Sequence, residues 1–216
     1  MAEIKFCGLT RAVDAEHAVA LGAAYVGVIF AGGPRLLSVP RAAEVFARVP
    51  DAVARVGVFG AQTAQEIGNT AEAVGLSVVQ LHAGGDRTRV RQIRQVFDGD
   101  IWLVHRVKND DLPAAASELA TYGDGIVLDT FVPTVLGGSG QAMDWNRLVP
   151  RLDTIRHSKR LILAGGLRPE NVARAIAAIS PDVVDVSSGV EAAPGIKDHE
   201  RMTAFRDAVL EASIST

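Results

Sequence analysis

The sequence contains a single cysteine among its 216 residues, so no disulfide can form within the chain. Nor does it begin with a basic segment followed by an apolar stretch, as a secretory signal would. Because disulfides accumulate in oxidising compartments, both absences favour a cytoplasmic protein. The thiol of Cys7 is then free to take part in chemistry.

Long apolar runs and an excess of positive charge are also absent. The longest apolar stretch, Ala23–Ala31, is far shorter than the roughly 20 residues that a membrane-spanning helix needs. The 22 Lys and Arg residues are outnumbered by 25 Asp and Glu, which gives a net charge of −3. Binding to a phosphate backbone needs a concentrated basic surface, so we expect neither a membrane nor a nucleic acid as a partner.

Aromatic residues make up only 5% of the chain, whereas 48% of it is hydrophobic. The core must therefore consist mainly of Ala, Val, Ile and Leu, which suits a sheet buried on both faces. The sequence has no G-x-S-x-G elbow, no H-E-x-x-H pair and no paired cysteines with zinc spacing. We therefore expect neither a serine hydrolase nor a metal site.

Apolar segments of strand length alternate with amphipathic helical segments along the whole chain. The expected strands are Ile4–Gly8, Tyr25–Phe30, Ala54–Phe59, Ser77–His82, Ile101–Val107, Gly125–Asp129, Arg160–Ala164 and Val183–Ser187. The expected helices are Arg11–Leu21, Pro40–Val49, Thr63–Val74, Asp86–Phe97, Asp111–Tyr122, Asp144–Arg151, Pro169–Ala178 and Lys197–Ala212. Eight units in 216 residues, or 216/8, give about 27 residues each. The pattern predicts an α/β fold, a single (β/α)₈ TIM barrel over residues 1–216, rather than an open sheet, because no G-x-G-x-x-G follows the first strand.

Active sites of such barrels lie at the carboxyl ends of the strands, where several polar residues fall. Strand side chains alternate, so Lys5 and Cys7 point into the barrel when Ile4 and Phe6 face the helices. Asp129 ends the sixth strand in the phase that reaches the same opening. A thiol and a carboxyl placed there can act as base and acid, although a lone cysteine is often a core residue and a strand-end Asp is often a helix cap. We expect the Lys5 ammonium to lower the pKa of Cys7.

Further candidates for binding follow the other strands. Gly166 lies in a glycine turn after the seventh strand, and Ser188 and Gly189 follow the eighth, where barrels often bind phosphate. In addition, Arg35 lies after the second strand, His82 ends the fourth and Asp185 lies on the eighth. An arginine there can bind a carboxylate at two points, whereas Arg35 and His82 can equally be surface residues. The glycine-rich loop Thr130–Met143 has the length of a functional loop.

These residues resemble the phosphoribosylanthranilate isomerase family of tryptophan biosynthesis. The resemblance covers the chain in order. It rests on Lys5-Phe6-Cys7-Gly8-Leu9-Thr10, Arg55-Val56-Gly57-Val58-Phe59, Gln80-Leu81-His82, Leu128-Asp129-Thr130, Gly137-Gly138-Ser139-Gly140, Asp144-Trp145, Ala164-Gly165-Gly166-Leu167, Pro169-Glu170-Asn171-Val172 and Asp185-Val186-Ser187-Ser188-Gly189-Val190-Glu191. It implies an Amadori isomerase that needs no cofactor and acts on a small phosphorylated substrate, N-(5-phosphoribosyl)anthranilate. We expect a monomer or a homodimer.

The resemblance also implies roles for single residues. Asp129 would be the general acid that opens the ribose ring, and Cys7 the general base that removes the C2 proton. Arg35 would hold the anthranilate carboxylate, at the opposite end of the substrate from the phosphate. Gly166, Ser188 and Gly189 would hold that phosphate.

Two alternatives remain open on the sequence. The related sugar isomerase of histidine biosynthesis performs the same chemistry with an Asp/Asp pair, against which Cys7 argues. A barrel that only binds a phosphorylated metabolite or a protein is the non-enzyme alternative, and the pairing of Cys7 with Asp129 disfavours it. A turnover assay with both substrates separates these possibilities.

Overall fold

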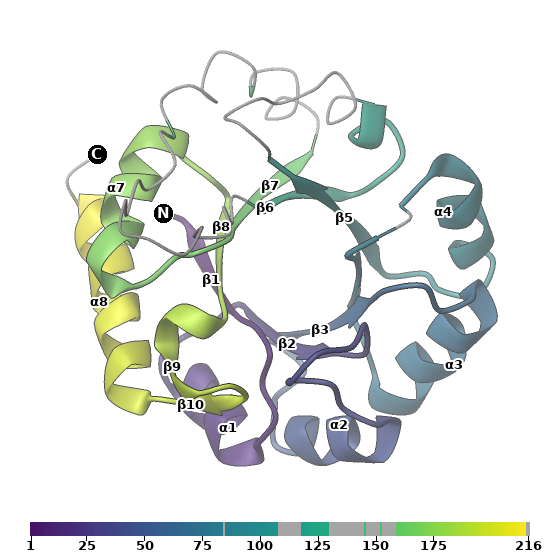
Figure 1. Ribbon diagram of the computed structural model, residues 1–216, viewed down its shortest axis with the longest axis horizontal. Coiled ribbons are helices and arrows are strands. Elements are labelled where there is room, and N and C mark those ends of the chain that lie inside the picture. The colour runs from purple at the N-terminus through teal and green to yellow at the C-terminus, as the bar shows by residue number, and fades with distance from the viewer. Residues whose placement is uncertain (84, 108–117, 130–144, 146–151, 153–158, 215–216) are drawn as a thin grey trace, which may run out of the picture.

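The strands of the computed structural model form a closed parallel barrel in the order β1 to β8, with helices outside it (Figure 1). The structure describes residues 1–83, 85–107, 118–129, 145, 152 and 159–214. The strands are β1 (Glu3–Phe6), β2 (Tyr25–Ile29), β3 (Ala54–Phe59), β4 (Val78–Leu81), β5 (Asp100–Arg106), β6 (Gly125–Asp129), β7 (Arg160–Ala164) and β8 (Val183–Val186). The prediction of a (β/α)₈ barrel is confirmed, because β1 pairs in parallel with β8 and leaves no open edge.

The described helices lie at the predicted places. They are α1 (Ala12–Ala20), α2 (Val39–Phe46), α3 (Ala64–Val74), α4 (Arg87–Ile93), α7 (Pro169–Ile179) and α8 (His199–Ile214). Helix α3 begins at a capping box, in which Glu66 N donates to Thr63 Oγ1 and Thr63 N donates to the Glu66 carboxylate. It ends at Gly75, which is left-handed at φ 64°. Local sequence signals therefore determined both ends of this helix.

Other predicted segments fall largely or wholly outside the described residues. These are Asp111–Tyr122, Asp144–Arg151 and the loop Thr130–Met143.

The core is divided between two layers. Side chains on the outer faces of the strands pack against the helices, as Phe6 does against Phe205 of α8. A second cluster fills the barrel itself and consists of Tyr25, Val56, Val78, Trp102, Val127, Ile162 and Val183. The Trp102 indole needs the bare backbone of Gly125, since a Cβ there would lie 2.8 Å from its ring. Because this cluster plugs the barrel, polar side chains further along the strands line only its carboxyl end.

Several predicted helix boundaries differ from the structure: α2 ends at Phe46 rather than Val49, α4 ends at Ile93 rather than Phe97, and α8 begins later than expected. The last helix was expected to begin at Lys197, but it begins at His199. Lys197 instead belongs to a short hairpin of β9 (Glu191–Ala193) and β10 (Ile196–Lys197), which follows the 3₁₀ turn η2 (Ser188–Val190). The side chain of Lys197 is buried and returns to the end of β8.

Candidate active site

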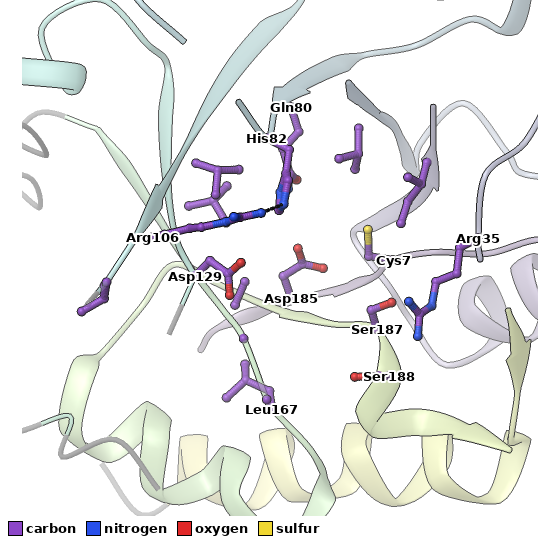
Figure 2. A pocket seen from close by; sticks show the side chains of 18 residues that line it. Cys7, Arg35, Gln80, His82, Arg106, Asp129, Leu167, Asp185, Ser187 and Ser188 are labelled. Atoms are coloured by element: carbon purple, nitrogen blue, oxygen red, sulfur yellow. Dashed lines mark hydrogen bonds between the residues drawn. The ribbon is translucent and has the colours of Figure 1, made fainter. Parts of the chain in front are cut away.

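A cavity of about 760 Å³ opens at the carboxyl ends of the strands (Figure 2). It is lined by Cys7, Ile29, Arg35, Val58, Gln80, His82, Val104, Arg106, Val107, Val127, Asp129, Ala164, Gly165, Gly166, Leu167, Asp185, Ser187 and Ser188. The cavity thus brings together every predicted site residue except Gly189. Its lower walls are aliphatic and its polar groups come from different strands, which is the arrangement expected of a small-molecule site.

Lys5 and Asp185 lie opposite each other on β1 and β8, below Cys7. Lys5 Nζ donates to Asp185 Oδ2 at 2.7 Å, and the Lys5 side chain is fully buried. The other carboxylate oxygen, Asp185 Oδ1, is buried and has no hydrogen-bond partner among the described residues. Asp185 also lines the cavity, so its carboxylate lies beside the space that a ligand would occupy.

The Cys7 thiol is buried, and the absence of a side chain at Gly27 makes room for it. A Cβ at Gly27 would lie 3.1 Å from Cys7 Sγ. Burial raises the pKa of Cys7, and the neighbouring Lys5 ammonium only partly opposes this effect. The expectation that Lys5 lowers the pKa of Cys7 holds for the contribution of Lys5 itself, but the pKa of Cys7 is raised on balance. The reason is that the loss of hydration on burial outweighs the effect of the ammonium, and the negative charge of Asp185, which is paired with Lys5, adds to the rise.

Asp129 lies at the end of β6, where it is the register partner of Arg106 on β5. Arg106 Nη2 lies 2.5 Å from His82 Nε2 at the end of β4, as the dashed line in Figure 2 shows. Burial lowers the pKa of His82, and the Arg106 charge lowers it further. His82 is thus held as a neutral imidazole whose Nε2 accepts a hydrogen bond.

Arg106 was not predicted as a site residue, although the signal existed in the sequence. It follows Trp102 and Val104 at intervals of two, and both of these side chains face the inside of the barrel. Gln80 shares this inward phase with His82, as the alternation predicted. Its Oε1 atom is buried and has no partner among the described residues.

The turns after β7 and β8 pack directly against each other. Gly165 and Gly166 both have positive φ angles, 91° and 65°, a conformation that residue types other than glycine rarely adopt. A Cβ at Gly189 would lie 1.8 Å from the carbonyl oxygen of Leu167, so only glycine fits there. Gly166 and Ser188 line the cavity. Gly189 does not line it, but its lack of a side chain allows the turn after β8 to lie against the turn after β7.

Arg35 lies beside the β8 turn rather than across the cavity from it (Figure 2). A Cβ on Gly8 would lie 2.6 Å from Arg35 Cδ and 2.8 Å from Ser187 Oγ, so both side chains crowd the same point. The guanidinium binds Glu191 at two points, with Nε–Oε1 at 2.7 Å and Nη2–Oε2 at 2.5 Å. The sequence indicated neither this partner nor the buried Lys197, which donates to the same carboxylate at 2.9 Å.

No group of three or more His, Cys, Asp or Glu side chains in the described part of the chain is placed to hold a metal ion. None of its helices is long and apolar enough to cross a membrane.

Comparison with known proteins decides the family. The family model described as N-(5'phosphoribosyl)anthranilate (PRA) isomerase matches residues 4–208. The chain belongs to the phosphoribosylanthranilate isomerase family. It is 43% identical to the N-(5'-phosphoribosyl)anthranilate isomerase of Pseudomonas fluorescens Pf0-1 over 206 residues, which cover 95% of this chain and 97% of the relative. The enzyme of the same name from Ralstonia pickettii 12J is 40% identical over 97% of this chain and 93% of its own.

Solved structures of phosphoribosylanthranilate isomerases have the same fold. The Thermotoga maritima enzyme superposes with a TM-score of 0.88 at 36% identity, over 98% of this chain and 100% of its own. A second isomerase structure, in complex with reduced 1-(o-carboxyphenylamino)-1-deoxyribulose 5-phosphate, gives a TM-score of 0.85 at 34% identity, again over 98% and 100% of the two chains. These likenesses confirm the family that the sequence resembled.

Proposed function

We propose that this protein converts N-(5-phosphoribosyl)anthranilate to 1-(2-carboxyphenylamino)-1-deoxyribulose 5-phosphate, with Asp129 as general acid and Cys7 as general base. The observation that carries the proposal is that Cys7 and Asp129, which end strands far apart in the sequence, line one cavity. Family membership supports the reaction, and the ligand of the related complex is a reduced form of this product.

The proposed first step is ring opening. Asp129 donates its proton to the ring oxygen of the ribose as the C1–O bond breaks, and the nitrogen lone pair forms the C1=N bond of a Schiff base. In the second step the Cys7 thiolate takes the proton from C2, and those bonding electrons form an enolamine. The enolamine then tautomerises to the ketone, with a proton returning to C1. Each transfer needs an acid or base within reach of the sugar, which a single cavity provides.

The remaining predicted residues would bind the parts of the substrate that do not react. Gly166 and Ser188 offer the backbone of two turns to the phosphate, and Gly189 permits those turns to meet. Asp185 Oδ1 would accept a hydrogen bond from a sugar hydroxyl, because it has no other partner among the described residues. His82 offers a neutral ring to the same cavity. Arg35 would bind the anthranilate carboxylate.

The test is a turnover assay with purified protein. Loss of anthranilate fluorescence on adding N-(5-phosphoribosyl)anthranilate is the expected result, and the histidine-pathway substrate serves as a parallel assay. No turnover of the anthranilate substrate overturns the proposal, and turnover of both substrates makes the protein a dual-substrate isomerase.

We further propose that the enzyme works in the cytoplasm as a monomer or a homodimer. The Thermotoga maritima isomerase is described as dimeric, with engineered monomers also solved. Sedimentation equilibrium of this protein distinguishes the two states.

A further inference from the structure

Glu191 is the last residue of the family motif Asp185–Glu191, which includes the end of β8 and the turn after it. It has no role in the proposed acid–base steps or in phosphate binding. Its carboxylate is nearly buried, with a side chain 5% exposed, and it touches no predicted site residue except Arg35 among the described contacts. Burying a carboxylate costs free energy unless it is paired with a positive charge. The partners of Glu191 therefore show what its burial achieves.

Glu191 is fixed in place independently of Arg35. Lys197 Nζ donates to Glu191 Oε1 at 2.9 Å and to the backbone carbonyl of Ser187 at 3.0 Å, and its side chain is fully buried. Burial would raise the pKa of Glu191, but the hydrogen bonds from Arg35 and Lys197 hold it below its usual range. The Glu191 carboxylate is therefore ionised and accepts hydrogen bonds from a position behind the cavity wall.

Arg35 in turn uses only part of its guanidinium on this acceptor. Its Nε and Nη2 atoms face Glu191, which occupies the side-on edge of the planar group. The guanidinium carries five N–H donors, so Nη1 and the second hydrogen of Nη2 remain for the end-on edge. Arg35 lines the cavity and its side chain is 21% exposed, whereas Glu191 is not among the lining residues.

The aliphatic part of the Arg35 side chain is confined, as the guanidinium is. It crosses Gly8, where a Cβ would lie 2.6 Å from Cδ, so the chain passes over bare backbone. With its stem confined at Gly8 and its side-on edge bound to Glu191, the guanidinium has little rotational freedom left. Such preorganisation lowers the entropic cost of binding an anion.

We propose that Glu191 is a positioning residue: it binds the side-on edge of Arg35 so that the end-on edge faces the substrate carboxylate. Lys197 fixes Glu191, and through it the hairpin β9–β10 supports the site. This inference rests on the proposed function, because it takes the anthranilate carboxylate as the anion that Arg35 binds. The opposite role, a carboxylate that competes with the substrate for Arg35, predicts the opposite change in KM.

The experiment compares Glu191→Gln, Arg35→Met and the double variant in steady-state turnover of N-(5-phosphoribosyl)anthranilate. Losing a charged two-point contact is expected to raise KM about tenfold or more in Glu191→Gln, with a smaller change in kcat. In the Arg35→Met background, Glu191→Gln should change KM less than about twofold, since it acts through Arg35. The matched control is Glu3→Gln, which breaks the Glu3–Arg160 pair at the opposite end of the barrel and should leave KM unchanged.

Three results overturn the inference: an unchanged KM in Glu191→Gln, a lowered KM, or an equal effect with and without Arg35. If Glu191→Gln does not fold, Glu191→Asp replaces it, because the shorter side chain keeps a charge beside Lys197 but cannot span both contacts to Arg35. Inhibition by inorganic phosphate shows whether Arg35 binds the carboxylate or the phosphate of the substrate. The inhibition constant of phosphate should be the same in Glu191→Gln as in the wild type. A higher constant in the variant would overturn the proposal that Arg35 binds the carboxylate. Failure of the wild-type protein to turn over the substrate is a different result, which overturns the proposed function itself.

Discussion

Lys5 and Asp185 form a 2.7 Å ion pair across the two strands that close the barrel, although 180 positions separate them in the sequence. The pair occupies the level directly below Cys7, and its carboxylate adds to the effect of burial, which raises the pKa of the thiol despite the nearby cation. The ammonium is neutralised by a carboxylate that also faces the cavity. The same pair therefore affects the stability of the fold, the pKa of the Cys7 thiol and the polar lining of the cavity.

The first prediction concerns stability. Asp185→Asn should lower the free energy of unfolding by about 3–5 kcal/mol, because it leaves a buried ammonium without its counter-charge. The double variant Lys5→Met with Asp185→Leu removes both charges and should be more stable than Asp185→Asn alone. Urea denaturation measures all three proteins. A double variant no more stable than Asp185→Asn would contradict the view that the loss comes from an unpaired buried ammonium.

The second prediction concerns the thiol. Since burial raises the pKa of Cys7, the thiolate should form only at alkaline pH, above the ordinary range of a cysteine. A general base acts when deprotonated, so the thiolate is the form of Cys7 that the proposed mechanism requires. The chain has one cysteine, so ultraviolet thiolate absorbance reports Cys7 alone, with Cys7→Ser as the blank. A thiolate already formed at neutral pH would contradict the prediction.

The third prediction concerns the chemical step. Cys7→Ser and Asp129→Asn should each lower kcat by about 10²–10⁴-fold, the usual contribution of a general acid or base. The phosphate turns are untouched, so KM should change much less. Near wild-type turnover in either variant would remove that residue from the mechanism.

The fourth prediction concerns the phosphate turn. Gly166→Asn adds a side chain at a left-handed position that Asn tolerates, and among the described residues, its chain neighbours aside, no atom lies within 4 Å of the new Cβ. The side chain would therefore project into the space where the phosphate is proposed to bind, and KM should rise about tenfold or more. The control is Gly22→Asn, at an exposed glycine with φ 79° and equally open space. Equal KM values in the two variants would place the phosphate elsewhere.

The fifth prediction concerns His82. Arg106→Met removes a positive charge next to the imidazole, which favours the protonated ring, so the pKa of His82 should rise. Nuclear magnetic resonance titration of the ring protons measures it, and His82→Gln assigns the signal. Arg48→Met, at an exposed arginine paired with Glu16, is the control and should leave His82 unchanged. A fall in the pKa would contradict the charge argument.

The sequence predicted the barrel well because its information is local. Alternation along the first strand predicted that Cys7 points inward, and the helix expected from Asp86 does begin there, where the Asp86 carboxylate accepts a hydrogen bond from Arg89 N. The hairpin after β8 was missed for the same reason. Its strands are two and three residues long, too short to show a period.

The sequence by itself thus determined the eight βα units, the end of the barrel where the site lies, and Cys7, Asp129 and the two small-residue turns as its candidates. Only the tertiary structure decided which charges meet. It paired Lys5 with Asp185, Arg35 with Glu191 and Glu191 with Lys197, and it buried Cys7 so that the pKa of the thiol is raised despite Lys5. The physical reason is that periodicity along the chain specifies the direction of a side chain. Its electrostatic surroundings depend on closure of the barrel, which brings β8 and the segment after it against β1 and the loop after β2.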